Sequence, residues 1–126
     1  MGVAGAKGRL LMEYRLDSGV AVVTVTGEVD IATSGAFRDG LLRVITDESH
    51  CSLVVNLARV RFIDSTGIGV LIGIWHSLRA RNSSFALADP SRQARRLLHT
   101  TGLAKAFWVF DTEAGAVEAC RPPAAG

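Results

Sequence analysis

The period of apolar and polar positions changes several times along the chain, and each stretch of constant period predicts one element. Two stretches that alternate or are β-branched flank the turn-forming tripeptide Asp17-Ser18-Gly19, and together they predict a β-hairpin that Gly27 closes. Beyond it, short apolar runs predict strands, and apolar positions spaced three or four apart predict helices. The predicted strands are 10–16, 20–26, 53–57, 85–88 and 107–110, and the predicted helices are 31–45, 65–81, 91–102 and 112–120.

The order of these elements, β-β-α-β-α-β-α-β-α, predicts the fold class. Strands that alternate with helices become parallel neighbours in one sheet. The pattern therefore predicts a single α/β domain with a mixed sheet, opened by the hairpin, and about four helices, and the length of 126 residues fits one domain. Residues 1–9 are expected to form a flexible leader, residues 10–120 the domain and residues 121–126 a tail.

Composition and charge narrow the classes of function. Apolar residues make up 48% and charged residues 21% of the chain, as in soluble globular proteins. The net charge of +2 argues against binding through bulk charge, so we expect no direct contact with nucleic acid. The longest uncharged stretch, residues 65–78, is too short to span a bilayer, and the N-terminus lacks the apolar core of a signal peptide. We expect no membrane insertion and a cytoplasmic location.

Residues that commonly bind metals or form disulfides are scattered. Cys51 and Cys120 are far apart and fit no C-x-x-C motif, which favours two free thiols over a disulfide. The histidines, His50, His76 and His99, have no second ligand at helical spacing. We therefore expect neither a metal nor another cofactor. The sequence also offers no acid–base pair beside a plausible nucleophile, so we do not expect an enzyme.

The most informative segment is Asp64-Ser65-Thr66-Gly67-Ile68-Gly69, at the start of the second predicted helix. It has three interpretations. Asp64 and Ser65 are helix-capping residue types, and capping alone would explain them. Ser65 as a nucleophile is the second, although the Gly-x-Ser-x-Gly spacing and a nearby base are missing. In the third, Ser65 accepts a phosphate, which the positive end of the helix tolerates and a partner protein senses.

A second polar cluster, Gly27-Glu28-Val29-Asp30, ends the hairpin. Asp30 would lie beside Asp64 if the two strands that precede them run parallel. A phosphate on Ser65 would then crowd three anionic groups on one surface. The alternative is that Asp30 and Thr33 only cap the first helix.

The helix that follows Gly67 is apolar on more than one side. Its main stripe is predicted to be Ile68, Leu71, Ile72 and Trp75, with Val70 and Ile74 outside it. Such a helix is buried or is partly a docking face, and Gly69 and Gly73 leave a smooth strip for close packing. Farther along, residues 79–105 hold six basic residues and one acid, which is consistent with a solvated face, a contact for an acidic partner or weak nucleic-acid affinity.

These motifs also carry a family resemblance. Four motifs recur in order and spacing: 27–30, the 53–57 strand, Phe62-Ile63-Asp64-Ser65-Thr66-Gly67-Ile68-Gly69, and Thr101-Gly102-Leu103. With them the chain resembles, over about residues 10–120, the STAS domain of bacterial anti-sigma-factor antagonists. The resemblance implies a STAS-like fold and a regulatory binding module.

The resemblance further implies a partner switch. The unphosphorylated protein would bind an anti-sigma factor with serine kinase activity and free a sigma factor. That kinase would then phosphorylate Ser65, with Thr66 as the second candidate, and a serine/threonine phosphatase would restore the active form. The implied partner-binding residues are Asp30, Asp64, Thr66, Gly67, Ile68 and Gly69.

Two other functions stay open at this point. STAS-like domains also serve as subunits of membrane transport complexes, including those that transport lipids. A small-ligand or nucleotide sensor is the other alternative, because a helix start can bind an anion, although the sequence contains no P-loop motif.

Overall fold

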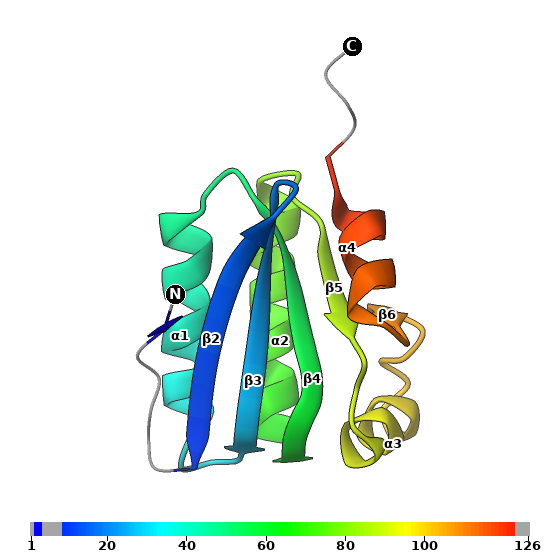
Figure 1. Ribbon diagram of the computed structural model, residues 1–126. Coiled ribbons are helices and arrows are strands. Elements are labelled where there is room, and N and C mark those ends of the chain that lie inside the picture. Colours follow the sequence, from blue (N-terminus) through cyan, green and yellow to red (C-terminus); the bar gives the residue numbers. More distant parts are fainter. Residues whose placement is uncertain (1, 4–8, 123–126) are drawn as a thin grey trace.

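The computed structural model describes residues 2–3 and 9–122, which form one mixed sheet with helices on both faces (Figure 1). The strands are β1 (Gly2–Val3), β2 (Leu10–Asp17), β3 (Val20–Val29), β4 (Ser52–Ile63), β5 (Phe85–Ala88) and β6 (Trp108–Phe110). The helices are α1 (Ser34–Asp47), α2 (Ser65–Ala80), α3 (Arg92–Thr100) and α4 (Glu113–Cys120).

The strands lie in the sheet in chain order. β1 pairs with β2 and β2 with β3 in antiparallel fashion, whereas β3, β4, β5 and β6 are parallel. The predicted α/β fold with its opening hairpin is thus confirmed, and every predicted strand and helix is present. One strand was not predicted: β1 lies within the expected leader and pairs with Met12 and Glu13. The remainder of that leader before Arg9, and tail residues 123–126, lie outside the described residues.

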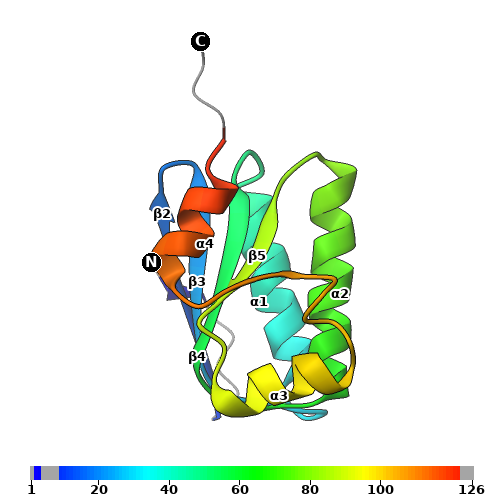
Figure 2. The same cartoon turned by 90° about the vertical axis from the view of Figure 1, so that its right-hand side faces the viewer.

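Helices cover the two faces of the sheet unequally. α1 and α2 lie against one face, α4 lies on the other, and α3 lies beside the edge at which the parallel strands end (Figures 1 and 2). The larger apolar core fills the space between the sheet and α1 and α2, and a smaller cluster lies under α4. β3 and β4 lie at the centre of the sheet and are covered on both faces. Neighbouring residues of each strand point to opposite faces, and all four of Val22, Val23, Val54 and Val55 are buried.

Two boundaries differ from prediction in a way that shapes the site. β3 and β4 run farther than expected because their parallel pairing continues to Val29 and Ile63. α1 begins at Ser34, not at residue 31. The reason is a local turn, in which the Asp30 carboxylate accepts hydrogen bonds from the amides of Ala32 (2.9 Å) and Thr33 (3.2 Å). Such side-chain contacts compete with helical hydrogen bonding.

The buried side of α2 also differs from prediction. Ile74 faces the core together with Ile68, Leu71 and Leu78, whereas Ile72 and Trp75 are half-buried at the margin. The sheet therefore contacts a side of the helix rotated away from the predicted stripe. Both cysteines are free thiols, as predicted, and burial raises the pKa of the Cys120 thiol to about 11.

Candidate functional site

The carboxyl ends of β3 and β4 bring the two polar clusters together. Val29 and Ile63 are register partners in the parallel pair, and the Asp64 amide donates a hydrogen bond to the Val29 carbonyl (3.1 Å). Asp30 and Asp64 are the next residues on their strands, so they leave the sheet side by side at one edge. This is the arrangement that the sequence predicted for parallel strands.

Asp64 is the N-cap of α2. Its Oδ1 accepts hydrogen bonds from the amides of Thr66 (2.9 Å) and Gly67 (3.4 Å) and from the Thr66 hydroxyl. The capping interpretation is therefore correct for Asp64. One consequence is that two of the amides at the helix start, which the sequence assigned to an added anion, already have a carboxylate partner.

Ser65 and Thr66 differ in the freedom of their hydroxyls. Ser65, the first residue of α2, is exposed, and its hydroxyl has no hydrogen-bond partner among the described residues. Thr66 is half-buried, and its hydroxyl donates to Asp64. A visiting active site would therefore reach the Ser65 oxygen without breaking a contact, whereas the Thr66 oxygen is held in place.

The glycines and the isoleucine that follow divide between the interior and the surface. Gly67 is buried, and a Cβ built there would lie 2.7 Å from a Cγ1 atom of Val29 and 2.7 Å from one of Ile63. Ile68 is only 5% exposed. These two residues seat the helix start against the ends of β3 and β4. Gly69 is exposed with open space beside it.

Gly69 lies in a surface groove. The groove has a volume of about 390 Å³ and runs between α1 and α2. Its lining residues are Arg38, Leu42, Thr66, Gly69, Val70, Gly73, Ile74 and Ser77. Gly73 also has open space where a side chain would be. The groove is therefore open at these two positions because neither glycine fills it with a side chain.

Asp30 is tied to Arg9. The Arg9 guanidinium contacts Asp30 at 2.8 Å and Glu28 at 2.6 Å. Desolvation alone would raise the pKa of Asp30, but the hydrogen bonds from Arg9 and from the Ala32 amide outweigh it and hold the pKa below its usual value. Arg9 is fixed there because its carbonyl accepts from the Glu28 amide (2.9 Å), beside Gly27, whose Cβ would collide with that same carbonyl.

Three residues of this edge, Arg9, Ile31 and Phe62, are not among the predicted site residues. Arg9 falls in the expected leader, and Ile31 stands at the start of the predicted helix 31–45. Ile31 is 83% exposed, and Phe62 is 43% exposed just before Ile63. The spacing of Asp30 and Thr33, which is typical of a turn before a helix, is the signal that would have placed Ile31 outside the helix.

The described residues show neither a metal-type cluster nor a membrane-type helix. Within the described part of the chain, no three His, Cys, Asp or Glu side chains lie close enough together to share a metal ion. None of the helices in that part combines the length and apolarity that crossing a bilayer requires.

The chain is similar to a group of known proteins. A sequence model of the STAS domain matches residues 12–116. A Paenibacillus polymyxa protein named anti-sigma F factor antagonist is 30% identical over 108 residues, which is 86% of this chain and 92% of the relative. A crystal structure of an anti-sigma factor antagonist from Mycobacterium paratuberculosis has 29% identity and a TM-score of 0.82, covering 97% of this chain and 100% of the other. The phosphorylated form of the Bacillus cell fate determinant SpoIIAA has 24% identity and a TM-score of 0.66, covering 87% of this chain and 99% of the other.

Proposed function

Because the chain belongs to the STAS domain family, we propose that it is an anti-sigma-factor antagonist that phosphorylation of Ser65 switches off. Unphosphorylated, it binds an anti-sigma factor with serine kinase activity and thereby frees a sigma factor. The kinase transfers the γ-phosphate of ATP to the Ser65 oxygen, and the complex separates. The observation that carries this proposal is the placement of Ser65, an exposed hydroxyl without a partner among the described residues, at the first position of α2.

The relatives support this proposal. The Paenibacillus polymyxa and Mycobacterium paratuberculosis proteins are both named as anti-sigma factor antagonists, and they match nearly the whole chain. SpoIIAA, which shares the fold, has been solved in a phosphorylated form, so this fold accommodates a phosphate.

A phosphate on Ser65 acts on the partner more than on the fold. It adds about −1.5 to −2 charges near neutral pH. At the first position of a helix that charge is favourable, by about 0.3–1 kcal/mol at an exposed site, so α2 stays folded. The amides of Thr66 and Gly67 are already engaged by Asp64, and the phosphate therefore projects its charge outward.

The phosphate separates the complex because its negative charge, together with that of Asp64, repels the surface of the kinase. The sequence predicted that Asp30 would add a third negative charge, but Arg9 pairs with Asp30 and offsets it. A loss of about 3–4 kcal/mol at the interface lowers affinity by about two to three orders of magnitude, which is enough to release a partner.

The contact surface for the kinase surrounds Ser65. It combines the polar groups of Asp30, Asp64 and Thr66 with the exposed apolar side chains of Ile31 and Phe62. Gly69 adds the open groove beside α1. Gly67 and Ile68 are buried beneath this surface and support it by fixing the position of the helix start. A serine/threonine phosphatase reaches the same exposed position and regenerates the antagonist.

Binding measurements with Ser65 variants test this function. The kinase is recovered with Ser65→Ala as bait, and its affinity is measured by calorimetry for the wild type, Ser65→Ala and Ser65→Asp. We expect Ser65→Ala to bind like the unphosphorylated wild type and Ser65→Asp to bind at least about tenfold more weakly. Ser49→Asp, which adds the same charge at an exposed position after α1, is the control and should bind normally. Equal affinities for Ser65→Ala and Ser65→Asp would contradict the proposal.

A further inference from the structure

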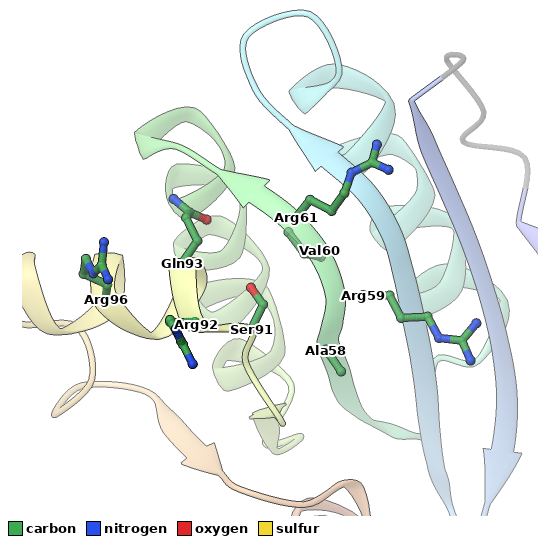
Figure 3. A pocket seen from close by; sticks show the side chains of 8 residues that line it. All are labelled: Ala58, Arg59, Val60, Arg61, Ser91, Arg92, Gln93 and Arg96. Carbon is green, nitrogen blue, oxygen red and sulfur yellow. The ribbon is translucent and has the colours of Figure 1, made fainter.

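A cleft of about 410 Å³ lies between β4 and the start of α3 (Figure 3). Four of its eight lining residues are arginines, and none is acidic. Arg59 and Arg61 extend from β4, and Arg92 and Arg96 extend from α3. One pair of arginines on β4 and one pair on α3 therefore flank the cleft.

Most of this positive charge is uncompensated. Arg61 contacts Glu28 at 3.5 Å, whereas Arg59, Arg92 and Arg96 form no ion pair with any other described residue. The side chains of Arg59 and Arg61 extend from β4 toward the β3 side, whereas those of Arg92 and Arg96 lie on the α3 side (Figure 3). The chain as a whole has a net charge of only +2, so this cleft is a local concentration of positive charge.

The cleft is joined to the edge that carries Ser65. The Gln93 side chain, in the cleft wall, accepts a hydrogen bond from the Ile63 amide and donates one to the Ile63 carbonyl, both at 2.8 Å. Ile63 directly precedes Asp64 and Ser65. On the same wall, the Ser91 amide donates to the Leu57 carbonyl (3.2 Å). A protein that reaches Ser65 therefore passes close to the cleft, whose position relative to Ser65 is fixed.

We propose that this cleft docks an acidic segment, rich in Asp and Glu, of the kinase that acts on Ser65; this inference rests on the function proposed above. Guanidinium groups bind carboxylates through paired hydrogen bonds. The arginines flank the open cleft on both sides and are exposed, so their side chains can turn toward the acidic side chains of an extended segment that lies between them. A kinase docked in this cleft stays bound while Ser65 lies in the active site of the kinase.

The test reverses two charges that the fold does not use. In Arg92→Glu/Arg96→Glu, two exposed side chains without ion pairs change sign, and an acidic residue at position 92, the first of α3, favours the helix, so the temperature of thermal unfolding should change little. The control, Arg43→Glu/Arg81→Glu, makes the same change in net charge at exposed positions near the C-terminal ends of α1 and α2. Kinase affinity is measured for wild type, variant and control at 50, 150 and 500 mM NaCl.

We expect the cleft variant to bind the kinase at least about tenfold more weakly than the control at 50 mM NaCl. The gap should narrow at 500 mM, because salt screens the lost attraction. Equal affinity of variant and control would overturn the cleft assignment while the wild type still bound the kinase. Failure of the wild type to bind the kinase would instead overturn the proposed function. A single-stranded oligonucleotide that binds the wild type but not the cleft variant, and displaces the kinase, would assign the cleft to nucleic acid and also overturn the inference.

Discussion

Gly67 and Gly69 lie two positions apart in α2 and have opposite surroundings. Gly67 packs against the γ carbons of Val29 and Ile63, both of which are fully buried. Gly69 faces the open groove, and a Cβ built there would meet no atom of another element within 4 Å. The sequence motif offers both glycines as partner contacts, but only the second presents a surface.

Alanine at these two positions should therefore change stability in opposite directions. We expect Gly67→Ala to lower the free energy of unfolding by about 1–3 kcal/mol, because β-branched neighbours at the strand ends have little room to move. Gly69→Ala should raise it by about 0.5–1 kcal/mol, because alanine favours the helix. Urea unfolding followed by tryptophan fluorescence measures both. A Gly67→Ala protein as stable as the wild type would show that the helix start is not seated as described.

At the scale of elements, the Asp30 turn before α1 is held together by the contacts of a carboxylate. It is held by the Ala32 and Thr33 amides and by Arg9, and these contacts keep the pKa of Asp30 below its usual value despite its partial desolvation. A carboxylate with a lowered folded-state pKa stabilises the protein above the unfolded-state pKa, and that contribution is lost as the pH falls through the folded-state pKa.

The pH dependence of Asp30→Asn tests this turn. We expect the wild type to be more stable than Asp30→Asn at pH 7 and the difference to shrink as the pH falls below about 4, the unfolded-state pKa of Asp. Chemical unfolding at pH 7, 5, 4 and 3 provides the comparison. Asp39→Asn, at an exposed position of α1, is the control and should show no such trend. A wild-type advantage that stays constant down to pH 3 would show that the charge of Asp30 is not what the turn uses.

The elements themselves were predictable, and their ends were less so. The 3.6-residue period identifies the helices because they are buried on one face, and the short apolar runs identify the central strands because these are buried on both faces. The ends of β3 and β4 depend on pairing between strands that lie far apart in the sequence, which periodicity does not reveal. The late start of α1 follows from the local contacts of Asp30, which outweigh the apolar side chain of Ile31.

The candidate site was predictable where it depends on neighbouring residues. Capping by Asp64 and the juxtaposition with Asp30 follow from residue type and parallel strands. The ion pair of Arg9 with Asp30 was not predictable, because it needs the hairpin to bring Arg9 to the end of β3. The buried position of Gly67 likewise depends on the placement of the helix start against two strand ends.

At the scale of the whole molecule, two surfaces of different charge meet at one edge of the sheet. The edge with Asp30, Asp64 and Ser65 carries the proposed switch, and the arginine cleft adjoins it through Gln93. The basic run over residues 79–105 indicated part of this charge. It did not indicate the cleft, because Arg59 and Arg61 come from another segment, while Arg79 and Arg81 lie at the opposite end of α2.

The central claim is that Ser65 carries the regulatory phosphate, and site mapping after the kinase reaction tests it most directly. The protein is incubated with ATP and the kinase recovered as above, and intact mass and peptide spectra are recorded for the wild type and Ser65→Ala. We predict one phosphate per chain, located on Ser65, no modification of Ser65→Ala, and an unchanged circular dichroism spectrum of the phosphorylated protein. An unmodified wild-type chain, or a phosphate found on a residue other than Ser65, would contradict the account.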